Sequence, residues 1–148
     1  MQSFLYIVDD NPDHHFLLYR ILKELPSSPR VQFFEDGRSL IWQLTALLDN
    51  NQPLPSLIIL DLNMPGINGL QLLQQLKGTV QEKPAPFAHV PVIIMSSETS
   101  QHKMQKCYQA GANAFIEKPL YLDQMKKTIA AVCDFWIGVN RISENKTA

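Results

Sequence analysis

Cysteine is scarce in this chain of 148 residues, which contains only Cys107 and Cys133. The two lie far apart and lack the short spacing of metal-binding cysteines, so the sequence gives no support for a zinc site or a disulfide framework. Both fall at core positions of predicted helices. We therefore expect two buried thiols in a protein of a reducing compartment.

Long apolar runs and clusters of basic residues are also absent. No window approaches the ~18 consecutive apolar residues of a membrane-spanning helix, and the first ten residues lack the basic leader of a signal peptide. A formal charge of -1 without a basic stripe argues against nucleic acid or an anionic membrane as partner. These absences predict a cytoplasmic protein, and its 45% apolar residues are typical of a globular domain.

Short apolar runs alternate with helix-type patterns along the whole chain. The predicted strands are Phe4–Val8, Val31–Phe34, Leu57–Leu60, Val90–Met95 and Ala114–Ile116. Each precedes a segment with apolar residues at three- and four-residue spacing, the last ending near Trp136. This repeat predicts the α/β class, a doubly wound parallel sheet with helices on both faces. We expect one domain over residues 1–148, with a core at about 4–136 and a tail at 137–148.

Polar side chains stand where four of the predicted strands end. The first strand is followed by Asp9 and Asp10, the third by Asp61, the fourth by Ser96, and the fifth leads to Lys118. The carboxyl ends of parallel strands share one edge of the sheet, and ligands bind there in open α/β folds. We therefore expect these five residues to converge.

The residue types at this edge indicate phosphoryl chemistry. Three neighbouring carboxylates raise one another's pKa unless a cation is present, and Mg²⁺ binds one or two carboxylates together with water. Mg²⁺, the ammonium of Lys118 and the hydroxyl of Ser96 would together hold phosphoryl oxygens. Asp61 is then placed as the nucleophile that would carry an acyl phosphate.

Each of these residues also has an ordinary structural explanation. The acidic pair and Ser96 could be helix caps, and Asp61 could belong to a turn. Lys118 could be a solvated residue before a proline that starts a helix. The argument for a site rests on their occurrence at successive strand ends within one repeat pattern.

Taken together, these motifs resemble those of a two-component response regulator receiver domain. They are the acidic pair, the D-x-N-M-P-x-x-x-G block from Asp61 to Gly69, Ser96 and the Lys118-Pro119 dipeptide. The resemblance covers about residues 4–136 and implies a flavodoxin-like (βα)5 fold with strand order 2-1-3-4-5. It implies that Asp61 accepts a phosphoryl group from a histidine kinase or phosphotransfer protein, with Ser96 and Lys118 holding its oxygens. It also implies a Mg²⁺ site made by Asp9, Asp10, Asp61 and the backbone carbonyl of Asn63, with Asp9 acting mostly through water.

The resemblance further implies how the phosphorylated state would be sensed. Phe115 matches the aromatic switch position, where the ring turns inward as Ser96 moves toward the phosphoryl group, although Phe115 lacks the hydroxyl of a tyrosine. Asn63 and Glu98 match positions that tune the loss of the phosphoryl group. The fourth helix, fifth strand and fifth helix should form the moving surface, and output should pass by protein contact to a target that the sequence does not name.

The long Gly78–His89 connection and the Phe135-Trp136 end resemble the small regulators that partner bacterial phytochromes and related kinases. An exposed Phe135 or Trp136 could also seed a homodimer. The adjacent His14 and His15 point about 100° apart on a helix, which argues against a shared metal-ligand face. We expect both histidines to be solvated near the acidic pocket.

The same residues are compatible with two other functions. An aspartyl-phosphate hydrolase of the haloacid-dehalogenase type would use the same nucleophile, but those enzymes have D-x-D, whose second aspartate is a general acid. Asn63 occupies that place here and cannot deliver a proton. A receiver-like scaffold that is never phosphorylated would not need the complete set of acceptor residues. We therefore expect self-phosphotransfer and autodephosphorylation, without turnover of a separate substrate.

Overall fold

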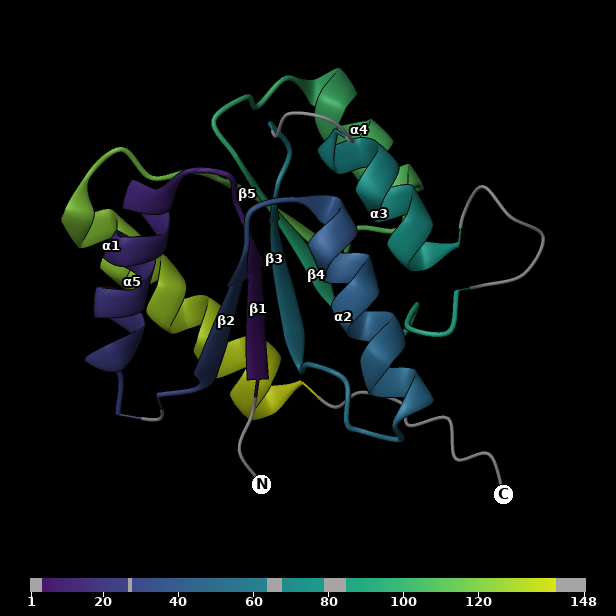
Figure 1. Cartoon of the computed structure of the whole chain (residues 1–148). Helices are drawn as coiled ribbons and strands as arrows, with labels where there is room; N and C mark the ends of the chain where they lie inside the picture. The colour runs from purple at the N-terminus through teal and green to yellow at the C-terminus, as the bar shows by residue number, and fades with distance from the viewer. Residues whose placement is uncertain (1–3, 27, 64–67, 79–84, 141–148) are drawn as a thin grey trace.

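A computed structural model describes residues 4–26, 28–63, 68–78 and 85–140 of the chain. Its strands are β1 (Phe4–Val8), β2 (Arg30–Phe34), β3 (Leu57–Asp61), β4 (Val92–Ser96) and β5 (Ala114–Glu117). They form one parallel sheet in the order β2-β1-β3-β4-β5, as Figure 1 shows. The predicted strand order is confirmed, and all the strands end at the same edge of the sheet.

Five α-helices connect or follow the strands: α1 (Pro12–Lys23), α2 (Gly37–Asp49), α3 (Gly69–Lys77), α4 (Gln101–Gln109) and α5 (Leu122–Cys133). Four of them begin after a residue whose side chain accepts a hydrogen bond from a backbone N–H of the first turn. This bond fixes where the helix starts. These caps are Asn11, Asp36, Asn68 and Ser100.

The apolar residues of the strands point alternately to two separate cores, because successive side chains of a strand face opposite sides. Tyr6 and Val8 pack on the face covered by α2, α3 and α4. Leu5 and Ile7 pack on the face covered by α1 and α5. Figure 1 shows these two groups of helices on either side of the sheet. Both strand faces are buried, as expected of a central parallel strand.

Several predicted element boundaries were wrong by a few residues. Strand β4 begins at Val92 rather than Val90, because Pro91 has no N–H to donate to a neighbouring strand. Helix α1 ends at Lys23, since the N–H of Leu25 bonds to the carbonyl oxygen of Leu22 in a tighter turn.

The chain after α5 also differs from the expected tail. A six-residue π-helix, Asp134–Val139, continues from Cys133. The expected tail began at Ile137, yet Trp136 and Ile137 are partly buried against the core beside α5. The two rings of Phe135 and Trp136 meet edge to face, with centroids 5.1 Å apart. The packed part of the chain therefore extends past residue 136.

Two further expectations concern burial and the long connection. Cys107 and Cys133 are buried free thiols, as predicted. Residues 79–84 of the Gly78–His89 connection lie outside the described part of the chain, whereas Phe87 in its second half is buried in the core. Among the helices that the structure describes, none combines the length and apolar character needed to cross a bilayer.

Candidate functional site

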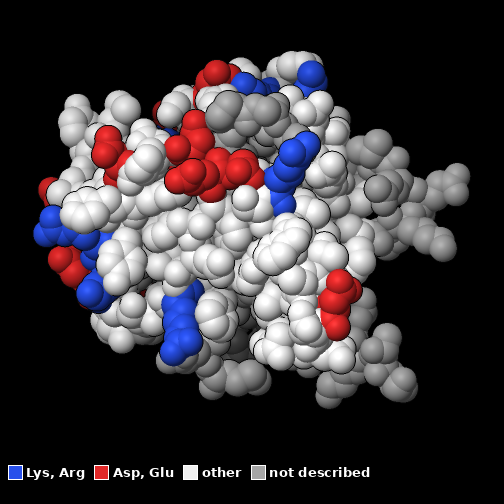
Figure 2. Space-filling model, in the orientation of Figure 1, with Lys and Arg blue, Asp and Glu red and all other residues white. Residues whose placement is uncertain are grey.

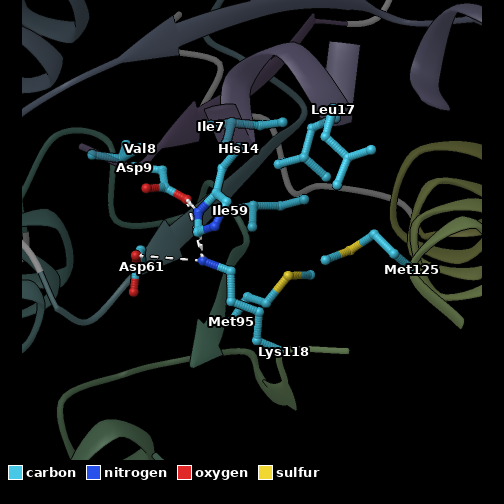
Figure 3. Close-up of a pocket in the computed structure, with 11 residues that line it drawn as sticks. Ile7, Val8, Asp9, His14, Leu17, Ile59, Asp61, Met95, Lys118 and Met125 are labelled. Carbon is cyan, nitrogen blue, oxygen red and sulfur yellow. Dashed lines mark hydrogen bonds and ion pairs between the residues drawn. The ribbon is translucent and has the colours of Figure 1, made fainter. Parts of the chain in front are cut away.

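Asp9, Asp61 and Lys118 meet at the carboxyl edge of the sheet. Asp9 directly follows β1, Asp61 is the last residue of β3, and Lys118 directly follows β5. The Nζ atom of Lys118 lies 3.4 Å from Oδ2 of Asp9 and 3.7 Å from Oδ2 of Asp61. Figure 3 shows the three side chains pointing toward one another. The structure therefore brings together residues that are far apart in the sequence, as the strand-end pattern predicted.

Asp10 joins these residues to form an acidic cluster. Carboxylate oxygens of Asp9, Asp10 and Asp61 all lie within 4.8 Å of one another. Asp9 is buried, Asp61 is half-buried and Asp10 is exposed, so the cluster opens to solvent on one side. In Figure 2, acidic side chains gather at the top of the molecule, where the strands end. Three converging carboxylates form a donor set that fits a hard divalent cation such as Mg²⁺.

Backbone amides fix the orientation of two of these carboxylates. The N–H of Asn11 donates to Oδ1 of Asp9 over 2.9 Å. The N–H of Asn63 donates to Oδ1 of Asp61 over 3.1 Å, which keeps the Asn63 peptide beside the cluster. Orienting hydrogen bonds of this kind are usual around metal-binding carboxylates.

The environment of Asp61 disfavours its negative charge. Burial raises the pKa of the Asp61 carboxyl above its ordinary value, the Asn63 amide and the Lys118 ammonium act against this, and the charges of Asp9 and Asp10 add to it. The side chain is 13% exposed. A cation at the cluster would stabilise the ionised, nucleophilic form of Asp61.

The expected switch and tuning residues lie around this centre in different ways. Ser96 ends β4 and is fully buried, and its Oγ accepts a hydrogen bond from the N–H of Glu98 over 3.1 Å. The carboxylate of Glu98 pairs with the ammonium of Lys103 in the first turn of α4. Phe115 is partly buried against the core on the α4 side of the sheet. The hydroxyl acts only as an acceptor in this bond, so its own hydrogen can still be donated to a phosphoryl oxygen.

His14 and His15 lie near the acidic pocket, as expected, but they are half-buried and hydrogen-bonded to Asp9 rather than simply solvated. Nδ1 of His14 lies 2.9 Å from Oδ2 of Asp9 and 2.9 Å from Nζ of Lys118. His15 bonds through Nε2 to the backbone oxygen of Asp9 and stacks on Phe33, with centroids 4.8 Å apart. The cause is that α1 starts three residues after Asp9, so its first turn lies against the end of β1.

His14 is therefore a site residue that the sequence pattern did not identify. One ring nitrogen either donates to Asp9 or accepts from Lys118, because it cannot do both at once. The only sequence signal for this role was that His14 falls in the first turn of a helix that follows the acidic pair. Beneath these polar groups the pocket is lined by apolar side chains, including Ile59, Met95 and Met125 (Figure 3).

The fold and the site define a flavodoxin-like α/β protein with an acidic, metal-compatible edge. The chain belongs to the response regulator receiver domain family, which matches residues 5–130. It is 39% identical over 136 residues to two-component response regulator ARR17 of Arabidopsis thaliana, covering 86% of this chain and 84% of that protein. The family assignment made from the motifs is thus confirmed.

Solved structures show the same architecture. The phosphorylated cyanobacterial phytochrome response regulator RcpA superposes with a TM-score of 0.84 at 23% identity, covering 97% of this chain and 100% of that one. The bacteriophytochrome response regulator AtBRR gives a TM-score of 0.69 at 25% identity and covers 99% of both chains. These similarities confirm the flavodoxin-like fold with its five-stranded order.

Proposed function

We propose that this protein is a single-domain response regulator that accepts a phosphoryl group on Asp61 in a Mg²⁺-dependent reaction. The observation that carries the proposal is the meeting of three carboxylates within 4.8 Å of one another, with the Lys118 ammonium 3.7 Å from Asp61. One anionic nucleophile, one fixed cation and a set of metal ligands are the parts that phosphoryl transfer needs.

The residues divide the chemical work among them. A carboxylate oxygen of Asp61 forms a P–O bond as the P–N bond of a donor phosphohistidine breaks, and the leaving imidazole takes a proton from water. Asp9, Asp10, Asp61 and the Asn63 carbonyl would hold Mg²⁺, which neutralises charge on the phosphoryl oxygens. The ammonium of Lys118 would contact a phosphoryl oxygen on Asp61.

We expect the donor to be a histidine kinase or a phosphotransfer protein. A groove between α1 and α5 lies next to the site and is lined by Phe16 and Leu122, which are 64% and 48% exposed. Leu120 and Tyr121, in the connection that follows Lys118, are 89% and 70% exposed. Exposed apolar side chains beside a reactive centre are suited to docking of a protein donor.

Output would follow from a conformational change on the face made by α4, β5 and α5. Rearrangement of Ser96 and Lys118 around a phosphoryl group would shift the population of two conformers. Phe115 would act as the switch residue and Asn63 and Glu98 as residues that set the lifetime of the phosphorylated state. The partner would be an unidentified protein, and a homodimer through the exposed Phe135 is a further hypothesis.

The direct test is incubation with acetyl phosphate and Mg²⁺, followed by intact mass measurement. The wild type should gain one phosphoryl group, and this gain should disappear without Mg²⁺ and in Asp61→Asn. Asp49→Asn, which changes an exposed aspartate at the end of α2, is the matched control and should be phosphorylated like the wild type. An unmodified wild type in this assay, and with purified kinases, would favour the scaffold hypothesis.

The hydrolase hypothesis has a separate readout. Asn63 stands two residues after the nucleophile, where an aspartyl-phosphate hydrolase has its general acid. We therefore expect no multiple turnover of a generic phosphate monoester. Sustained release of inorganic phosphate from such a compound, lost in Asp61→Asn, would establish a hydrolase instead.

A further inference from the structure

Strand β5 is an open edge of the sheet, and one of its amides points away from the neighbouring strand. The N–H of Lys118 bonds to the carbonyl oxygen of Ser96 in β4. Successive amides of a strand point to opposite sides, so the N–H of Phe115 points outward. Edge amides of this kind are otherwise free to pair with another chain or with water.

The hydroxyl of Tyr108 occupies this outward position. Tyr108 lies near the end of α4, and its Oη accepts a hydrogen bond from the N–H of Phe115 over 3.1 Å. The sequence pattern identified Phe115 as a switch position without a hydroxyl. The structure supplies a hydroxyl at the backbone of that same residue from the helix that covers it.

Helix α4 is held to the domain by few buried side chains. Cys107 is the one fully buried residue among the nine of α4, all of which are described. Helix α3 has the same length but buries Gly69, Leu72, Leu73 and Leu76. The hydrogen bond of Tyr108 is therefore one of the few contacts that hold the end of α4 beside β5.

We propose that Tyr108 is a positioning residue of the phosphorylation switch, whose hydroxyl fastens α4 to the backbone of Phe115 in the unphosphorylated protein. The proposal rests on the function proposed above. Displacement of α4 from β5 must break this bond, so the bond favours the resting conformer. Loss of the hydroxyl should favour the active conformer by about fivefold, the equilibrium factor of one ordinary net hydrogen bond.

The test uses Tyr108→Phe, which removes the hydroxyl and keeps the ring. Tyr19→Phe is the matched control, because Tyr19 and Tyr108 are 44% and 47% exposed. The first measurement is amide hydrogen exchange of Phe115 in the unphosphorylated proteins by NMR, which requires no phosphoryl chemistry. We expect exchange at Phe115 to become about fivefold faster in Tyr108→Phe and to stay unchanged in Tyr19→Phe.

The second measurement is the affinity for beryllofluoride in the presence of Mg²⁺, an equilibrium probe of the phosphorylated conformer. A larger population of the competent conformer lowers the apparent dissociation constant, so Tyr108→Phe should bind up to about fivefold more tightly. A merely structural bond would change exchange at Phe115 without changing this affinity.

The outcomes separate the two proposals. Unchanged exchange at Phe115, or faster exchange with unchanged beryllofluoride affinity, would overturn the role of Tyr108 and leave the function of Asp61 standing. A wild type that neither binds beryllofluoride nor gains mass from acetyl phosphate would overturn both.

Discussion

The ammonium of Lys118 lies 3.7 Å from the carboxylate of Asp61, although the two residues come from strands at different places in the sheet. The Lys118 side chain is 15% exposed, and its ammonium also lies 3.4 Å from Asp9. It thus stands where it can contact a phosphoryl group, but it also repels any metal ion that the same carboxylates would bind.

This position predicts opposite effects of Lys118→Gln on two measurable quantities. Mg²⁺ should bind about fivefold more tightly, because about 1 kcal/mol of repulsion between the two cations is removed. Phosphorylation by acetyl phosphate should become slower, because a charged contact to the phosphoryl group is lost. Titration calorimetry and intact mass kinetics measure the two effects, with Lys127→Gln on the exposed face of α5 as control. Weaker Mg²⁺ binding in Lys118→Gln would contradict this account.

Asp61→Asn should stabilise the metal-free protein while abolishing phosphorylation. Burial raises the pKa of Asp61, so the folded protein pays a cost when the carboxyl ionises. The Asp61 carboxyl keeps its proton to a higher pH in the folded state than in the unfolded state. The free energy of unfolding of the wild type therefore falls as the pH rises above the ordinary value of 3.8. An asparagine keeps the acceptor for the Asn63 N–H and carries no charge.

At pH 7 without metal, we expect the free energy of unfolding of Asp61→Asn to be higher than that of the wild type. The difference should disappear below pH 3.8 and shrink on addition of Mg²⁺. Urea denaturation at several pH values measures it. Equal stabilities at pH 7 would show that the buried charge is already compensated by the protein.

Lys77, which lies at the other end of the sheet, should make the stability of the protein depend on pH. Its Nζ donates to the carbonyl oxygens of Ala88 and Val90 over 2.9 Å and 2.8 Å, and burial lowers its pKa to about 8. Between pH 8 and its ordinary value of 10.5, the unfolded chain binds a proton that the folded chain has released. The free energy of unfolding should therefore rise with pH in this window.

Lys77→Met removes this titration and also removes two hydrogen bonds, so the variant should be less stable at every pH. The informative quantity is the slope: the stability of the wild type relative to Lys77→Met should increase from pH 8 to pH 10. Lys127→Met, at an exposed position, should follow the wild type. Parallel pH profiles for wild type and Lys77→Met would refute the assignment.

Gly69→Ala tests how closely α3 is packed against the loop of the acceptor residue. A Cβ atom at Gly69 would lie 2.5 Å from Cα of Leu62 and 2.8 Å from the carbonyl oxygen of Asp61. Because these are backbone atoms, the loop must shift, and we expect a loss of about 1–3 kcal/mol or more in stability. Gly138→Ala is the control, since a Cβ there meets no atom within 4 Å. Thermal unfolding and Mg²⁺ titration should both respond in Gly69→Ala alone.

The predictable part of the fold came from patterns that are local in the sequence. Runs such as Leu57–Leu60 are typical of buried strands between helices. The cap Asn11 marks the start of a helix through its own side-chain chemistry. The start of β4 and the end of α1 were predicted less accurately. They depend on hydrogen bonds that Pro91 makes to another strand and that Leu25 makes to the preceding turn. The π-helical turn after Cys133 left no pattern distinct from the α-helix before it.

The sequence by itself determined the order of elements, the family and the set of polar residues at the strand ends. This was possible because parallel strands bring their carboxyl ends to one edge whatever the helices between them do. Only the tertiary structure decided which neighbours complete the site. His14 reaches Asp9 and Lys118, and Tyr108 reaches the backbone of Phe115, through the packing of helices on particular strands. Such contacts depend on the distance and rotation of one element against another, which no spacing of residues along the chain specifies.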